Sequence, residues 1–244
     1  MNSIPSNHPR FNSLNQRHLI ELGVKKGITS PQGLIAQGRG EAFDYLLKEK
    51  TSKFAEQAIK ASAALLLLAK NPVISTNGNT AVLCPKELIK LSNSLKCEIE
   101  VNLFYRTPKR EKLISKEFKK LGKEILGAGK KTKLRNLSSN RALVDPNGIG
   151  IADVVLVMLE DGDRTNALIK AKKKVIAIDL NPLSRTPQTA TISITDNVSR
   201  AVPLIAEQVK KLRNKKKPEL QKIISNYNNK LNLRNSINLI RKGI

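Results

Sequence analysis

The 244-residue sequence has few aromatic residues, cysteines and histidines. Aromatic residues make up 3% of the chain and tryptophan is absent, so the core must be built mainly from aliphatic side chains. Two cysteines, Cys84 and Cys97, are too few for a disulfide framework, and neither lies in a CxxC pair. We therefore expect both to be small core residues in a reducing compartment.

Several motifs of common enzyme classes are also missing. The two histidines, His8 and His18, show no metal-ligand spacing, and the sequence has no GxSxG nucleophile motif. Neither a Walker loop nor GxGxxG occurs, which argues against a nicotinamide-dependent oxidoreductase. These absences disfavour covalent hydrolysis and favour chemistry driven by positioning and charge neutralisation.

Long apolar segments are absent as well. The longest run, residues 63–69, is far shorter than the roughly 20 residues that a membrane-spanning helix needs. The N-terminal segment is polar and contains Pro5 and Pro9, unlike a signal peptide. We expect a soluble, cytoplasmic protein.

Positive charge is abundant. Lys and Arg number 44 against 20 Asp and Glu, a formal net charge of +24. Such an excess is compatible with nucleic-acid binding, with small anionic substrates, or with a source organism whose proteins are generally basic. The scarcity of aromatic residues makes nucleic acid an unlikely partner, because single strands are commonly bound by stacking on aromatic side chains.

Between residues 71 and 212, β-branched runs alternate with helical patterns, which predicts an α/β fold with a mainly parallel sheet. Ligands of such sheets bind at the carboxyl ends of the strands, so the loops after Thr76, Leu103, Val157 and Ile178 are the candidate sites. The expected strands are 72–76, 98–103, 124–127, 152–157, 174–178 and 190–194. The expected helices are 85–95, 109–121, a segment ending near 171, and one from Asn197 or Ser199 to 212, with a basic loop at 130–141.

The N-terminal region, residues 1–70, has a helical pattern interrupted by glycines. We expect one helix from Ser13 to about Val24, a glycine-rich loop, and a long buried helix over residues 54–70. The glycines that predict the loop are Gly27, Gly33, Gly38 and Gly40.

The C-terminal region changes composition. We predict a domain over residues 1–212, in which residues 1–70 are helical and residues 71–212 are α/β, followed by a basic extension over residues 213–244. The extension has a marginal helical period. It is either a solvated appendage or an arm that packs or binds RNA.

Two loops have the composition of an anion site. Arg39 lies between Gly38 and Gly40, and glycines let backbone N–H groups approach a phosphate while Arg supplies a fork of donors. A turn with a surface Arg is the alternative. The second loop, Asn77-Gly78-Asn79, follows a strand and precedes a helix, where amides can hold a carboxylate or phosphate. Its alternative is a tight turn with an Asn cap.

Two further loops indicate a nucleotide. Asp161 and Asp163 follow a strand and can assist Mg²⁺ bound to phosphates, although a helix cap is the alternative. Asp179 ends another apolar strand, where an acid can accept hydrogen bonds from ribose. Asn181, Arg185 and Thr186 follow it, and their convergence at one strand end favours one wall of a nucleotide-phosphate site.

Six stretches resemble the archaeal phosphopantothenate synthetase family, also called 4-phosphopantoate–β-alanine ligase. The resemblance covers about residues 4–206 and leaves out the tail. Its motifs are Ile4-Pro5 to His8-Pro9-Arg10, residues 31–46 with Pro31-Gln32-Gly33 and Gly38-Arg39-Gly40, Asn77-Gly78-Asn79, residues 101–106, residues 159–165 and residues 178–186.

The resemblance implies a Rossmann-like three-layer fold, a homodimer and a ligase of the coenzyme A route. The family joins 4-phosphopantoate to β-alanine with ATP, releasing AMP and diphosphate. The ATP contacts carried across by resemblance are Arg17, Arg39, Asp179, Leu180, Asn181, Arg185, Thr186, Asn197 and Val198.

The remaining assignments are hypotheses built on that chemistry. We expect an acyl-adenylate, because a carboxylate needs a leaving group before an amine can attack it. Arg side chains and Mg²⁺ accompanying ATP would neutralise the two anions. For the 4-phosphopantoate end we predict Asn77, Gly78, Asn79 and Arg106, and for assisting Mg²⁺ we predict Asp161 and Asp163.

Overall fold

The computed structural model describes residues 4–134 and 142–243. Its central sheet has five strands in the order β2-β1-β5-β6-β7, and every neighbouring pair is parallel. The strands are β1 (Pro72–Thr76), β2 (Glu98–Val101), β5 (Val154–Met158), β6 (Lys174–Ile178) and β7 (Ile192–Ile194). The order reverses between β1 and β5, which is the switch point where parallel α/β sheets place their ligands.

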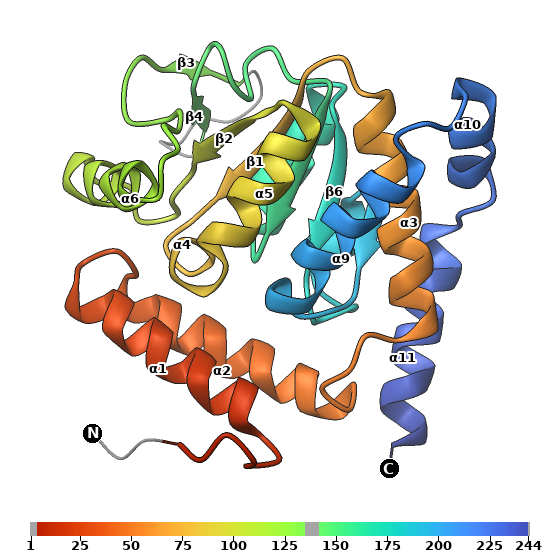
Figure 1. Ribbon diagram of the computed structural model, residues 1–244, viewed down its shortest axis with the longest axis horizontal. Coiled ribbons are helices and arrows are strands. Elements are labelled where there is room, and N and C mark those ends of the chain that lie inside the picture. Colours follow the sequence, from red (N-terminus) through yellow and green to blue (C-terminus); the bar gives the residue numbers. More distant parts are fainter. Residues whose placement is uncertain (1–3, 135–141, 244) are drawn as a thin grey trace.

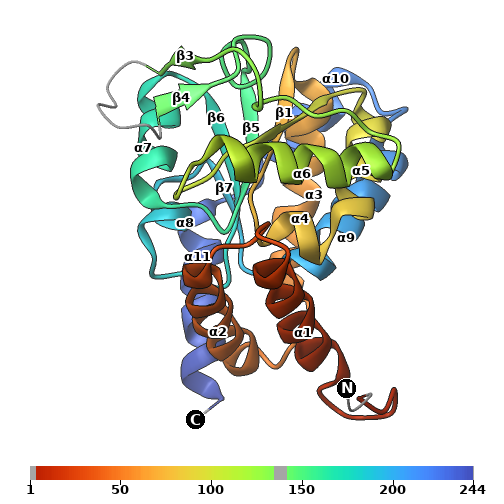
Figure 2. The ribbon, with the colours of Figure 1, turned by 90° about the vertical axis from the view of Figure 1, so that its left-hand side faces the viewer.

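Helices cover both faces of this sheet, which confirms the predicted three-layer, Rossmann-like fold (Figure 1). On one face lie α3 (Lys53–Leu68), α5 (Pro85–Leu95) and α9 (Val198–Leu212). On the other lie α7 (Gly162–Lys170) and α8 (Arg185–Thr189), as the second view makes clear (Figure 2). α6 (Pro108–Lys120) packs beside β2.

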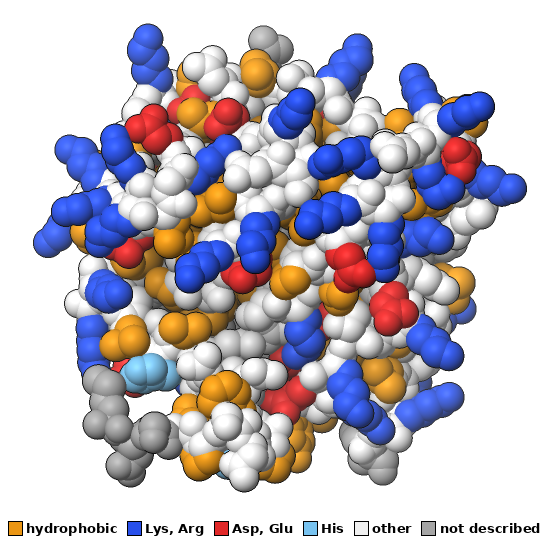
Figure 3. Space-filling view, in the orientation of Figure 1, with side chains coloured by type: hydrophobic (Ala, Val, Ile, Leu, Met, Phe, Trp, Pro, Cys, Tyr) orange, Lys and Arg blue, Asp and Glu red, His pale blue; other side chains and the backbone are white. Residues whose placement is uncertain are grey.

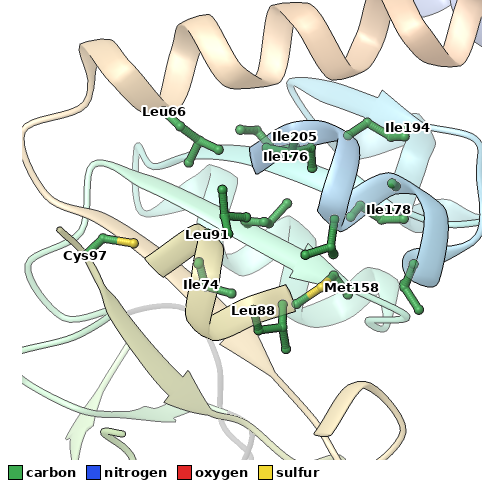
Figure 4. Packing of buried hydrophobic residues seen from close by; sticks show 14 of the residues in the cluster. Leu66, Ile74, Leu88, Leu91, Cys97, Met158, Ile176, Ile178, Ile194 and Ile205 are labelled. Carbon is green, nitrogen blue, oxygen red and sulfur yellow. The ribbon is translucent and has the colours of Figure 1, made fainter. Parts of the chain in front are cut away.

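Successive side chains of each strand point to opposite faces of the sheet, so the hydrophobic core has two parts, one on each face. Ile74, Leu156 and Ile176 belong to the cluster that packs under α3, α5 and α9. Val155 and Val175 belong to the second cluster. Figure 4 shows Leu66, Leu88, Leu91 and Ile205 pointing from the helices toward Ile74, Ile176 and Ile178 of the strands. As the composition predicts, the core is almost entirely aliphatic, and burying these side chains provides the main free energy of folding.

The N-terminal region forms a helical hairpin of α1 (Phe11–Lys25) and α2 (Pro31–Leu46), which lies beside the carboxyl ends of the strands (Figure 1). The predicted glycine-rich loop is therefore wrong over residues 31–41, because Gly33, Gly38 and Gly40 are inside α2. Pro31 occupies the first helical position, where its missing N–H is no loss.

The cost of these glycines, up to about 1 kcal/mol each, is offset by contacts outside the helix. Arg17 of α1 makes a two-pronged ion pair with Glu41 of α2, with N···O distances of 2.7 and 2.6 Å. Arg10 also donates to Glu41, at 2.7 Å. These bonds hold α2 against α1 and stabilise a helix that its own sequence disfavours.

Smaller differences from the prediction occur at the sheet edge. The expected strand 124–127 is a single bridge between Leu126 and Glu100. A short α4 (Thr80–Leu83) follows β1, and a hairpin of β3 (Thr132–Lys133) and β4 (Leu143–Val144) flanks β2. Most of the predicted basic loop at 130–141 lies outside the described residues.

The C-terminal region consists of α10 (Lys217–Ser225) and α11 (Asn229–Lys242), both packed on α3. Leu220 and Leu233 are buried. Asn232 donates to the carbonyl of Ser193 at 2.7 Å, which joins α11 to β7. The segment is thus an arm that packs on the fold. The division of the chain into a domain over residues 1–212 and an extension over residues 213–244 stays a prediction.

Both cysteines are buried, as expected, and burial raises the pKa of the Cys97 thiol to about 12. Lys and Arg side chains are spread over the whole face seen in Figure 3 and form no single stripe there. No helix among the described residues is long and apolar enough to span a membrane.

Candidate functional site

A cavity of about 280 Å³ lies at the carboxyl ends of β2, β1 and β5, next to the switch point of the sheet. Three of the four candidate loops, those after these three strands, line it, whereas the loop after β6 does not. The N-terminal half of α2 covers it with Gln32, Gly33, Ala36 and Arg39. Its volume is near the lower end of the roughly 300–1,000 Å³ typical of small-molecule sites, so a compact ligand fits it best.

The loop of Asn77, Gly78 and Asn79 forms the floor of the cavity and ties three elements together. Asn77 Nδ2 donates to the carbonyl of Met158 at 2.7 Å, joining β1 to β5, while its Oδ1 accepts the backbone N–H groups of Asn79 and Thr80. Asn79 Nδ2 donates to the carbonyl of Gly33 at 2.9 Å. The loop is therefore both the capped turn of the alternative interpretation and a wall of the cavity.

Two glycines allow α2, the turn before it and Arg110 to approach this loop closely. A Cβ on Gly33 would collide with Asn79 Oδ1 and Thr29 Cγ2. A Cβ on Gly78 would lie 2.6 Å from the carbonyl oxygen of Ile28 and 2.8 Å from Arg110 Nη2. At both positions the contact requires the absence of a side chain.

Of the two arginines that follow β2, Arg110 lines the cavity and Arg106 does not. Arg106 donates to Glu111 at 2.8 Å and to the carbonyl of Leu143 at 2.9 Å, and it also bonds Asn102 Oδ1 at 3.2 Å. Arg110 was not among the residues predicted from the sequence. Its position in the first turn of a helix that follows a strand end was the available signal.

A buried polar network supports the cavity from below. Arg164 Nη1 donates to Asn102 Oδ1 at 2.8 Å, and Arg164 Nε lies 3.4 Å from Glu160 Oε2. Burial raises the pKa of Glu160 to about 7, although the positive charge of Arg164 opposes that rise. Glu160 lines the cavity, so this wall includes an acid that exchanges its proton near neutrality. The sequence analysis assigned it no role.

The acidic loop after β5 is tied to the loop after β6. Asp161 is the N-cap of α7, because its Oδ1 accepts the backbone N–H groups of Asp163 and Arg164. Arg185 Nη2 pairs with Asp163 at 2.9 Å, and Thr186 Oγ1 donates to the carbonyl of Glu160 at 2.7 Å. Among residues 4–134 and 142–243, no group of three or more His, Cys, Asp or Glu side chains could hold a metal ion.

Asp179 and Asn181 form a tight turn beyond β6. Asp179 accepts the backbone N–H of Asn181 at 2.9 Å and the hydroxyl of Ser184 at 2.6 Å. Burial raises the pKa of Asp179, and the hydrogen bonds from Ser184 and Asn181, followed by the charge of Arg39, oppose the rise. Leu180 is buried, and its Cδ1 would lie 3.6 Å from a Cβ on Gly40. α2 therefore reaches from the cavity to the end of β6.

Arg17, Asn197 and Val198 lie outside the cavity. Arg17 faces the groove between α1 and α2. Asn197 caps α9, and its Nδ2 donates to Gln16 at 3.0 Å and to Asp44 at 2.9 Å. Val198 is buried in the core. Of the three, Arg17 lies near Arg39 in the chain of contacts, because its partner Glu41 is two positions from Arg39 on α2.

The fold is that of an α/β protein with a cavity next to the switch point of its parallel sheet. The family model described as phosphopantothenate/pantothenate synthetase matches residues 54–243, and the chain belongs to that family. The match confirms the resemblance found in the motifs and extends it through the C-terminal helices.

Curated relatives agree with this assignment. The 4-phosphopantoate–β-alanine ligase of Methanosarcina mazei is 50% identical over 245 residues, covering 100% of this chain and 96% of the relative. The ligases of the same name from Thermococcus onnurineus and Thermococcus kodakarensis are 50% and 49% identical over 231 residues, covering 94% of this chain and 88% of each relative.

We predict that Gly33→Ala disturbs the floor of the cavity, whereas Gly38→Ala in the same helix does not. The first substitution forces apart Gly33 and Asn79 and should lower the free energy of unfolding by about 1–3 kcal/mol. The second meets no atom within 4 Å and should raise it by about 0.5–1 kcal/mol, since Ala favours helices. Urea denaturation followed by circular dichroism measures both. Equal effects at the two positions would contradict the close contact.

Proposed function

We propose that this protein is a cytoplasmic enzyme that joins 4-phosphopantoate to β-alanine with ATP, giving 4′-phosphopantothenate for coenzyme A biosynthesis. AMP and diphosphate are the other products. The observation that carries the proposal is the family match, together with relatives of that name at about 50% identity over nearly the whole chain.

We assign 4-phosphopantoate, called the small acid below, to the cavity. The floor of the cavity is formed by Asn77, Gly78 and Asn79, the residues predicted for this substrate. Arg110 supplies the positive charge that the sequence analysis assigned to Arg106. Arg106 then has a supporting role, because its bonds to Glu111 and Asn102 hold the backbone around Arg110 in place.

ATP is assigned to the carboxyl end of β6, beside the turn of Asp179, Leu180 and Asn181. Arg185 and Thr186 begin the next helix and connect this turn to the loop after β5. Arg39 is the link between the two sites, since it lines the cavity and the next residue of α2, Gly40, lies beside Leu180. Asn197 and Val198, at the start of α9, contribute by shaping the neighbouring strand end.

This arrangement suits activation of a carboxylate. A carboxylate oxygen of the acid attacks the α-phosphorus of ATP and diphosphate leaves, giving an acyl-adenylate. The nitrogen of β-alanine in its neutral form then attacks the acyl carbon, AMP leaves, and the nitrogen loses a proton. Two anions must meet in the first step, and Arg39 reduces their repulsion. Holding the reactants in place provides much of the remaining acceleration.

Mg²⁺ is proposed to arrive with ATP. This ion keeps several waters and is usually held by substrate phosphates with one or two carboxylates. Asp161 and Asp163 are at a suitable strand end, but their oxygens also cap α7 and pair with Arg185. They therefore assist the ion from the protein side and do not form a closed metal site.

The decisive measurement is AMP release by the purified protein. We expect AMP only when ATP, 4-phosphopantoate and β-alanine are all present, since each substrate is needed for turnover of the ligase. AMP can be quantified by chromatography. AMP formation without 4-phosphopantoate and β-alanine, or no AMP formation with all three substrates present, would refute the proposed reaction.

We predict that Arg39→Ala lowers kcat/KM for ATP by at least about 10-fold, because a charge-assisted contact to the reacting phosphates is lost. The control is Arg241→Ala. Arg241 is also exposed but lies in the last turn of α11, and its removal should leave kcat/KM within about twofold. A change within twofold for Arg39→Ala would rule out its phosphate role.

The enzyme is also proposed to be a homodimer. α2 exposes four large apolar side chains, Leu34, Ile35, Tyr45 and Leu46, with Ile35 72% accessible. Three of them line the groove beside α1 in which Arg17 also lies, with Arg10 and Glu41 nearby. A second copy of the chain seated on this surface, which carries both charge signs, would cover the apolar side chains and bring Arg17 into the interface.

We expect Ile35→Asp to weaken this dimer, since a charge would be buried without a partner. Light scattering coupled to size-exclusion chromatography should give twice the chain mass for the parent protein and a lower mass for the variant. Leu231→Asp, at a 51% exposed position of α11, is the control and should keep the parent mass. A parent protein that is monomeric at every concentration would disprove the dimer.

A further inference from the structure

Arg110 is a partly buried cation with no carboxylate partner. Its Nη1 donates to the carbonyl of Tyr105 at 2.6 Å and its Nη2 to the carbonyl of Ile28 at 2.9 Å. Its Nε is buried and has no hydrogen-bond partner. No Asp or Glu in residues 4–134 and 142–243 forms an ion pair with it, and burial alone lowers its pKa.

Other inward-facing arginines of the described chain differ in this respect. Arg106 pairs with Glu111, Arg164 with Glu160, and Arg200 with Asp44. Removing a guanidinium from water without a counter-charge costs free energy, so such groups are normally paired. Arg110 faces the cavity, and its unpaired charge indicates that an anionic ligand bound there provides the missing counter-charge.

The position of Arg110 is fixed by the chain around it. The two carbonyl acceptors belong to the loop before α6 and the turn between α1 and α2. Its Nη2 would lie 2.8 Å from a Cβ on Gly78, so the guanidinium rests directly on the backbone of the Asn77–Asn79 loop. The cation and this loop therefore form one wall of the cavity.

The strand order determines which end of the acid lies at this wall. Arg110 follows β2, and the turn of Asp179 follows β6, at opposite sides of the β1–β5 pair. The carboxylate of the acid must reach the nucleotide beside β6 to react. Its other end therefore points toward β2, where Arg110 lies, and away from the acids Glu160 and Asp161 after β5.

We propose that Arg110 binds the phosphate group of the small acid and selects 4-phosphopantoate over pantoate, the same acid with a free hydroxyl. The inference rests on the proposed function for the identity of the acid. Arg suits this task because its planar donors match phosphate oxygens, and a neutral hydroxyl leaves the charge uncompensated. Arg110 is thus a specificity-determining residue of the site.

The test compares Arg110→Ala and Arg110→Lys with Lys109→Ala, which removes the neighbouring exposed charge of α6. We expect Arg110→Ala to lower kcat/KM for 4-phosphopantoate about 100-fold, mainly through KM, and the Lys variant about 10-fold. KM for ATP and for β-alanine, and kcat/KM for pantoate, should stay within threefold. Lys109→Ala should behave as the parent.

A second readout does not depend on turnover. Inorganic phosphate should raise the melting temperature of the parent protein and of Lys109→Ala, but not that of Arg110→Ala. The Lys variant keeps a hydrogen-bond donor for the carbonyls of Tyr105 and Ile28. If circular dichroism shows that the Ala variant does not fold, the Lys variant is compared with the parent protein instead.

The outcomes separate this inference from the proposed function. If the parent releases AMP and Arg110→Ala keeps the parent preference for 4-phosphopantoate over pantoate, the role of Arg110 is wrong and the ligase stands. A rise in KM for ATP alone would equally overturn the role, by assigning Arg110 to the nucleotide. If the parent releases no AMP but phosphate stabilises it through Arg110, the anion site stands and the ligase fails.

Discussion

The buried hydrogen bond between Asn79 Nδ2 and the carbonyl of Gly33 joins the helical hairpin to the sheet, and the cavity depends on it. Other bonds also fix the hairpin, such as those of Asn197 to Gln16 and Asp44 and of Arg110 to the carbonyl of Ile28. The bond of Asn79 sets α2 itself against the loop after β1. With Gly33 against Asn79, the N-terminal half of α2 closes the space above β1 and β5. Arg39, six residues along the same helix, then lines the cavity, and the residue after it, Gly40, lies beside Leu180 at the end of β6.

The sheet was largely predictable because parallel strands buried on both faces have continuous apolar, β-branched sequences. The runs at Pro72–Thr76 and Lys174–Ile178 have the bounds expected from the sequence. α2 was not predictable in this way. Its glycines favour a loop locally, and the helix exists because Glu41 binds Arg17 and because Gly33 must approach Asn79 closely. Contacts between distant segments overrode local preference.

The candidate site was predictable at the level of loops but not of single side chains. Residues after β1, β2 and β5 could be chosen from the rule that ligands bind at strand ends. Arg106 and Arg110 both follow β2, and their sequence positions do not say which one a neighbouring carboxylate neutralises. Glu111 neutralises Arg106, whereas Arg110 meets only carbonyls. Such a distinction requires the three-dimensional surroundings of each charge.

The position of α3 also affects how the chain folds during synthesis. The second half of this helix is almost entirely apolar, and its main contacts are with β7, α9, α10 and α11. All four are made from residues after 191, more than 120 positions later in the chain. A nascent chain therefore carries an exposed, alanine- and leucine-rich helix until its last quarter has been made. Such long-range closure slows folding and leaves a period in which the unfinished chain can aggregate.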